Sequence, residues 1–259
     1  MSNETKSIIL YHRSYRKITR SLRVFLLQFL VIALPFSLSM VFCYPQITHT
    51  VCIFAQAVLV PFFSPDALRV IKLPYVVGNV FLIDLPSKYP SIFFSLVNSL
   101  VCLFLLVLLP VIRSAKHVFI FLIAVCFINL ISSLYFIFFP YHFPYEAVDY
   151  SELYIKQQVS IWFFVPIIMG LSILPLPSTL TSKMITMLVT FFYSLIFGTV
   201  RYVVFLFILA NASLLYMAVL FFVLGPLVDF IYIVGIYSVH VTMLSKKMRS
   251  DFTSWNWLY

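Results

Sequence analysis

Long apolar runs separated by short polar segments make up most of this chain. Four runs lie at residues 24–44, 91–112, 118–139 and 159–176. Each is close to or above the roughly 20 residues that a helix needs to cross a bilayer. A longer apolar tract, 184–244, comes after Lys183 and contains only Arg201 and Asp229 from among Asp, Glu, Lys and Arg. The pattern predicts an all-α fold, a polytopic transmembrane helix bundle of about six spans.

The tract after Lys183 is too long for one span, so we expect it to form two, at 184–210 and 214–244. The turn between them is predicted near Asn211, and Gly225 and Pro226 are predicted to kink the last helix. Lys183 and the basic cluster that begins at Lys246 both have cytoplasmic character, which requires an even number of crossings between them. The alternative is three spans with a turn at Gly225 and Pro226, which would place the two basic ends on opposite sides.

Composition supports the membrane assignment. The chain is 63% hydrophobic and only 10% charged, whereas soluble domains carry about 25% charged residues. The net charge of +9 comes largely from basic residues in a predicted N-terminal segment, 1–23, and a predicted tail, 245–259. This positive-inside pattern predicts that the N-terminus and the C-terminus are both cytoplasmic. The residues between them, 24–244, are predicted to form a membrane domain in the plasma (inner) membrane. The basic N-terminal tract stops where the first span starts, so we expect no nucleic-acid partner.

Two segments are predicted to be outer loops, 45–90 and 140–158. The first contains an apolar stretch at 51–63 that is too short to span, and prolines punctuate the residues after this stretch; a re-entrant or interfacial segment is the natural interpretation. Cys43 and Cys52 flank the beginning of this loop, which leaves a disulfide between them geometrically open.

Arg201 is the most informative candidate residue, because a charge inside an apolar run usually faces a bundle interior or a wet cavity. The competing interpretation is an arginine that extends to the headgroups. Asp229 is either its partner or a cap of the helix that restarts after Pro226. Possible companions of Arg201 are Ser160 and Gln158 at the mouth of the fourth span, Asn211, and Tyr202. We therefore take Arg201 and Ser160 as catalytic candidates, and Arg201, Asp229, Asn211 and Gln158 as candidates for binding a substrate or partner.

Other chemistry finds little support in the residues. The chain has no GxxxxGK[ST] nucleotide loop, no HExxH and no GxSxG. Its histidines are scattered and are predicted to lie at surfaces, so the sequence predicts neither a metal site nor a cofactor. Polar residues inside other spans are predicted to hydrogen-bond between helices; they are Gln28, Asn98, Asn129, Ser132 and Ser133.

The segment Phe197-Gly198-Thr199-Val200-Arg201-Tyr202, with an apolar run after it, resembles the arginine helix of the exosortase and archaeosortase family. Those proteins are polytopic membrane transpeptidases. The resemblance implies an outward-facing site with a cysteine nucleophile, an arginine and a histidine, which processes exported proteins bearing a C-terminal sorting signal. Arg201 carries over from that motif. This chain has Ser160 where the family has its cysteine, and His240 is expected at the opposite membrane face.

Three functions fit these observations. The one we favour is a non-enzymatic, multi-spanning subunit of a cell-envelope export or assembly complex, which acts through helix packing and its outer loops and has other envelope proteins as partners. The second is an outward-facing, exosortase-like transpeptidase or transferase centred on Arg201. The third is a transporter of small solutes or lipids, with Arg201 and Asp229 near its midplane.

Overall fold

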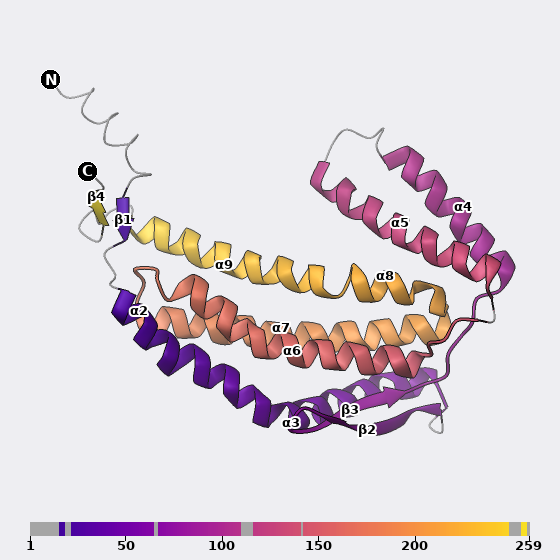
Figure 1. Cartoon of the computed structure of the whole chain (residues 1–259), viewed down its shortest axis with the longest axis horizontal. Helices are drawn as coiled ribbons and strands as arrows, with labels where there is room; N and C mark the ends of the chain where they lie inside the picture. Colours follow the sequence, from indigo (N-terminus) through magenta and orange to yellow (C-terminus); the bar gives the residue numbers. More distant parts are fainter. Residues whose placement is uncertain are drawn as a thin grey trace. The chain divides into compact units, whose positions relative to one another are not determined.

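The computed structural model describes residues 16–18, 22–64, 67–109, 116–140, 142–248 and 255–257, and they are mainly helical (Figure 1). The elements are β1 (Arg16–Ile18), α2 (Leu22–Gln28), the π-helical turn η2 (Phe29–Ala33), α3 (Leu34–Leu59), the 3-10 turn η3 (Val60–Phe62), β2 (Arg69–Tyr75), β3 (Gly78–Asp84), α4 (Ile92–Leu108), α5 (Lys116–Phe138), α6 (Ala147–Ile173), α7 (Leu180–Asn211), the 3-10 turn η6 (Leu214–Tyr216), α8 (Met217–Phe222), α9 (Pro226–Met248) and β4 (Trp255–Trp257). Residues 1–15, 19–21, 110–115 and 249–254, which include many of the basic residues behind the predicted sidedness, lie outside the described residues.

Within the described residues, five helical segments are long and apolar enough to cross a membrane. They are Leu22–Phe62, Phe119–Phe138, Ala147–Ile173, Leu180–Asn211 and Leu214–Lys246, and α4 is a shorter apolar helix. The prediction of a helical, multi-pass membrane protein is therefore confirmed. The number of crossings and the side of each terminus stay predictions.

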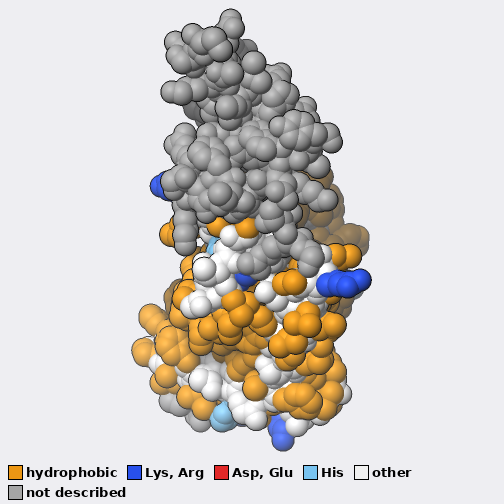
Figure 2. All heavy atoms as spheres, turned by 90° about the vertical axis from the view of Figure 1, so that its left-hand side faces the viewer, with side chains coloured by type: hydrophobic (Ala, Val, Ile, Leu, Met, Phe, Trp, Pro, Cys, Tyr) orange, Lys and Arg blue, Asp and Glu red, His pale blue; other side chains and the backbone are white. Residues whose placement is uncertain are grey.

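The surface has the character expected of a lipid-facing protein. Hydrophobic side chains cover most of the described surface in the view of Figure 2. Large apolar residues on α4 are among the most exposed, including Phe93 at 78% and Val107 at 67%. Contiguous apolar surface of this kind is rare on soluble monomers. In a bilayer, lipid chains would cover this apolar surface, which would then not be exposed to water.

The prediction of an outer loop at 45–90 is wrong for residues 45–59, about the first third of this range, because they are helical. Helix α3 continues through Pro45 to Leu59, so the stretch 51–63 extends the first helix and is not a separate re-entrant segment. Proline stops most soluble helices, but membrane helices tolerate it because neighbouring groups satisfy the freed backbone. Cys43 and Cys52 are free thiols on this one helix. Nine residues of helix separate them by about 13 Å, too far for a disulfide.

The predicted loop 140–158 is also mostly helical, because α6 begins at Ala147. Its polar residues favour a solvated loop when the sequence is considered alone. In the structure several of them point into the protein instead: Ser151 and Gln158 are 0% and 1% exposed. Buried polar side chains that hydrogen-bond inside a bundle do not require water around the helix.

By contacts the described chain separates into two compact units. Unit 1 comprises the described residues within Met1–Met40, Trp162–Tyr193 and Tyr232–Tyr259, and unit 2 comprises those within Val41–Ile161 and Ser194–Ile231. In unit 1, Ser37 donates a hydrogen bond from its hydroxyl to the Phe163 carbonyl, which joins α3 to α6. His240, predicted to lie at a surface, is 6% exposed there, with Thr186 Oγ1 2.8 Å from its Nδ1.

Unit 2 contains a β-hairpin that the sequence analysis did not predict. Strands β2 and β3 pair antiparallel, with Arg69 opposite Asp84 and Tyr75 opposite Gly78. At the turn, the Tyr44 hydroxyl accepts from the Gly78 N–H at 2.7 Å and donates to the Tyr75 carbonyl. A side chain of α3 therefore bridges the closing pair of the hairpin and fixes it to the helix.

The hairpin is also tied to the helices of unit 2 through Tyr202 on α7. The Tyr202 hydroxyl accepts from the Ile83 N–H at 3.0 Å and lies 2.5 Å from Ser151 Oγ on α6. Tyr202 is 0% exposed, so this hydroxyl links one strand and two helices away from water.

Tyr202→Phe is expected to lower the free energy of unfolding by about 1–3 kcal/mol, because it leaves the Ile83 N–H and the Ser151 hydroxyl buried without their partner. Denaturant titration of the purified protein in mild detergent measures this. Tyr145→Phe is the matched control, since Tyr145 is 49% exposed; an equal loss in both variants would contradict the role of the Tyr202 hydroxyl.

Helices α4 and α5 pair side by side (Figure 1) and share polar contacts. Asn98 Nδ2 donates to Ser133 Oγ at 2.6 Å, and Asn129 Nδ2 lies 3.4 Å from Asn98 Oδ1. Ser132 donates to the Leu215 carbonyl of η6 at 2.6 Å. The predicted interhelical role of these four residues is confirmed.

Candidate functional site

The candidate site forms where the last apolar segment is interrupted. Helix α8 ends at Phe222 and α9 begins at Pro226, which has no backbone N–H. The carbonyls of Leu224 and Gly225 lie at this break, and the Gly225 carbonyl accepts from the Asp229 N–H at 3.4 Å, as the first hydrogen bond of α9. A carbonyl oxygen has two lone pairs, so both carbonyls can accept a further hydrogen bond from a donor on another helix.

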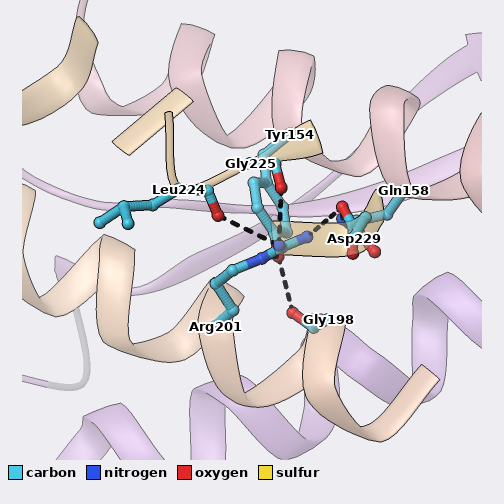
Figure 3. Close-up of polar contacts among 7 residues, drawn as sticks. All are labelled: Tyr154, Gln158, Gly198, Arg201, Leu224, Gly225 and Asp229. Carbon is cyan, nitrogen blue, oxygen red and sulfur yellow. Dashed lines mark hydrogen bonds and ion pairs between the residues drawn. The ribbon is translucent and has the colours of Figure 1, made fainter. Parts of the chain in front are cut away.

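Arg201 on α7 supplies that donor (Figure 3). Its Nη1 donates to the Leu224 carbonyl at 3.1 Å and to the Gly225 carbonyl at 2.9 Å. Its Nε donates to the Tyr154 hydroxyl at 2.9 Å, and its Nη2 donates to Asp229 Oδ2 at 2.7 Å. One guanidinium thus joins α6, α7, the α8–α9 break and α9.

Asp229 is the charge partner of Arg201. The two side chains are 5% and 4% exposed, and a buried guanidinium–carboxylate pair costs far less than either charge alone. Asp229 lies in the first turn of α9, where the helix dipole favours a negative charge. It is not the N-cap, because α9 begins three residues earlier at Pro226. The interpretation of Asp229 as a cap is therefore wrong, and the pairing interpretation is correct.

Tyrosine rings surround the ion pair. Tyr154 donates its hydroxyl to the Gly198 carbonyl at 2.8 Å while it accepts from Arg201. Its ring stacks on Tyr202 with centroids 5.4 Å apart and on Tyr150 at 6.0 Å. The guanidinium carbon lies 5.5 Å from the Tyr154 ring centroid, within range of a cation–π interaction. The aromatic stack keeps water from the pair and strengthens its electrostatics.

Gln158 completes the site from α6. Its Nε2 lies 3.5 Å from Asp229 Oδ2, at the limit of hydrogen bonding. Its Oε1 would be only 2.4 Å from a Cβ built at Gly198. Glycine at position 198 therefore provides the space in which the Gln158 amide approaches α7.

Of the predicted catalytic and binding candidates, the geometry brings together Arg201, Asp229 and Gln158 and leaves Ser160 and Asn211 apart; the predicted companion Tyr202 stacks on Tyr154. Ser160 is on α6, where its hydroxyl donates to the Lys156 carbonyl at 3.0 Å and lies 3.4 Å from the Tyr75 hydroxyl. Asn211 ends α7, ten residues or about 15 Å of helix beyond Arg201. It is exposed, and its carbonyl accepts from Lys88 Nζ at 2.6 Å.

Tyr154, Gly198 and the two carbonyls were not among the predicted site residues. Their spacing in the sequence was a usable signal. Tyr154 lies four residues before Gln158, and Gly198 lies three residues before Arg201, so each pair lies on one face of a helix. Assigning residues 140–158 to a loop hid the first pair.

Chemically, this arrangement is a closed clamp. The four hydrogen bonds of the guanidinium all end on acceptors of the chain itself, and Arg201 is 5% exposed. The side chain therefore does not reach toward headgroups. Within the described residues, no group of three His, Cys, Asp or Glu is placed to hold a metal ion.

Comparison of the chain with models of protein families, with curated proteins and with solved structures finds no match.

Proposed function

We propose that this protein is a multi-spanning subunit of a cell-envelope export or assembly complex in the plasma (inner) membrane, and that it acts through helix packing and extramembrane segments without catalysing a reaction. The observation that carries the proposal is the closed Arg201 clamp. A catalytic or substrate-binding arginine must offer donors to a ligand, whereas the contacts of this guanidinium hold the α8–α9 break, α6 and α9 together.

The β-hairpin supports the same proposal. Strand β3 is fixed to α3 and α7 by Thr48 and Tyr202, and the segment after it is fixed to α6 by a hydrogen bond from the Ala147 N–H to Ser87 Oγ at 2.8 Å. A rigidly held hairpin whose strand β2 is largely exposed suits the presentation of a surface to other proteins.

The test is purification of the tagged full chain from its native membrane in gentle detergent, and then mass spectrometry of proteins present in stoichiometric amount. We expect a reproducible set of envelope proteins. A chain that purifies alone as a monomer and turns over a substrate would contradict the proposal.

The two other functions predict different results at the same residues. An exosortase-like transferase centred on Arg201 would lose activity in Arg201→Lys while the folded protein persisted. A transporter would move small anions or lipids into liposomes that contain only this chain. The subunit proposal expects neither result.

A further inference from the structure

The hairpin has one covered edge and one free edge. The Phe81 and Ile83 N–H groups of β3 donate away from β2, to Thr48 Oγ1 at 3.4 Å and to Tyr202 Oη at 3.0 Å. The register places these residues opposite Lys72 and Val70. These are therefore non-hydrogen-bonded pairs of the antiparallel ladder, in which both residues direct their backbone N–H and C=O groups away from the partner strand. The N–H and C=O groups of Val70 and Lys72 therefore point outward, on the side of β2 away from β3.

This outer edge is unoccupied in the described part of the chain. No hydrogen bond found there reaches the backbone of Val70 or Lys72, and both residues are exposed. Pro74, the next residue of this set, has no N–H and so ends the donor pattern. The free donors thus lie only in the first half of β2. A free edge of this kind is a template for another strand.

A cavity of about 400 Å³ opens at that same end of the hairpin. Arg69, Asp84, Ser87, Tyr89 and Glu146 contribute polar groups to its lining. Arg69 and Asp84 are directly opposite in the register, and such opposite charges offset one another. Glu146, which is exposed, gives the cavity a net negative charge. A cationic group is the complementary occupant.

We propose that the outer edge of β2 at Val70 and Lys72 pairs with an extended peptide segment of a partner protein, and that a lysine or arginine of this segment enters the cavity beside Glu146. The main-chain hydrogen bonds of strand addition hold the segment, and the cavity selects its side chain. This inference rests on the proposed role as a subunit and specifies the kind of partner.

The test uses the full chain in lipid nanodiscs and pools of short capped peptides that differ in one fixed residue, with binding measured by fluorescence polarisation. Pools with a fixed Lys or Arg are expected to bind more tightly than pools with Asp or Glu. Val70→Pro removes one outward donor and no bond to β3, and we expect it to weaken binding roughly fivefold or more. Val70→Thr keeps the N–H and is the matched control.

Glu146→Gln separates the two parts of the proposal. It should abolish the preference for Lys and Arg while peptides still bind. N-methylation of alternate peptide amides should abolish binding altogether. The proposal is overturned if no pool binds, if Val70→Pro binds as tightly as Val70→Thr, or if the free edge only joins two copies of this chain. Because the assay uses no native partner, these failures are distinct from failure of the co-purification experiment.

Discussion

Arg201→Leu is expected to lower the free energy of unfolding by about 3–5 kcal/mol, the usual cost of leaving one charge of a buried pair without its partner. Asp229 would lose the Nη2 donor that lies 2.7 Å from its Oδ2. The Leu224 and Gly225 carbonyls would lose their shared Nη1 donor as well. The expected result in cells is loss of the protein itself, not a stable but inactive protein.

The measurement is a denaturant titration in mild detergent, with the steady-state level of the tagged protein in membranes beside it. Arg23→Leu is the matched control for the substitution, because Arg23 is exposed on α2, and its effect on the free energy of unfolding should stay within about 0.5 kcal/mol. Arg201→Leu protein that accumulates with unchanged stability would refute the clamp and return Arg201 to the catalytic candidates.

A double variant isolates the ion pair from the rest of the clamp. Arg201→Met combined with Asp229→Leu removes both charges, so its stability is expected to lie closer to that of the parent than Arg201→Met alone. The part that is not recovered measures the hydrogen bonds to the carbonyls at the helix break. Strictly additive losses would mean that the two side chains do not interact.

The sequence predicted the membrane class well because lipid-facing helices need little beyond length and apolar side chains. The sequence-based prediction of loops failed where polar side chains of a helix point into the protein. Residues 147–158 contain Asp149, Glu152 and Lys156, and this composition looks like a loop. In the structure Glu152 and Lys156 form an i,i+4 ion pair on α6, and every fourth residue from Tyr150 to Gln158 is buried.

The candidate site shows a second limit of sequence reasoning. Charge in an apolar tract identified Arg201 and Asp229, because burial of a charge is expensive wherever the helix goes. Their pairing depends on how α7 meets the break before α9, 28 residues further along the chain. Tertiary packing alone determines that meeting. Tyr154 carries no charge and could not be distinguished from other membrane tyrosines.

The break at Gly225 and Pro226 connects the two findings. Helices α8 and α9 are separated by residues 223–225, and the Leu224 and Gly225 carbonyls in this gap accept hydrogen bonds from Arg201. The same charge then requires a carboxylate, which Asp229 provides one turn into α9. The kink predicted from the sequence and the buried ion pair are therefore one structural device, and neither residue requires a ligand to explain its burial.

In unit 1, Gly170→Ala is expected to lower the free energy of unfolding by about 1–3 kcal/mol through overpacking. A Cβ at Gly170 of α6 would lie 2.6 Å from the Ala33 Cβ and 3.4 Å from the Phe29 ring. Phe29 and Ala33 begin and end the π-helical turn η2, so α6 packs closely against this irregular turn. Ala33 has no flexible side chain that could move aside, and the backbones themselves must separate.

Gly235 on α9 provides the matched control, because a Cβ there meets nothing within 4 Å. Gly235→Ala is expected to raise the free energy of unfolding by about 0.5–1 kcal/mol, since alanine loses less backbone entropy than glycine in a helix. Ala33→Gly should relieve the overpacking and make Gly170→Ala less costly in the double variant than in the parent. Denaturant titration of all four variants measures this coupling. If Gly170→Ala and Gly235→Ala changed stability equally, close packing at η2 would not be what requires glycine at position 170.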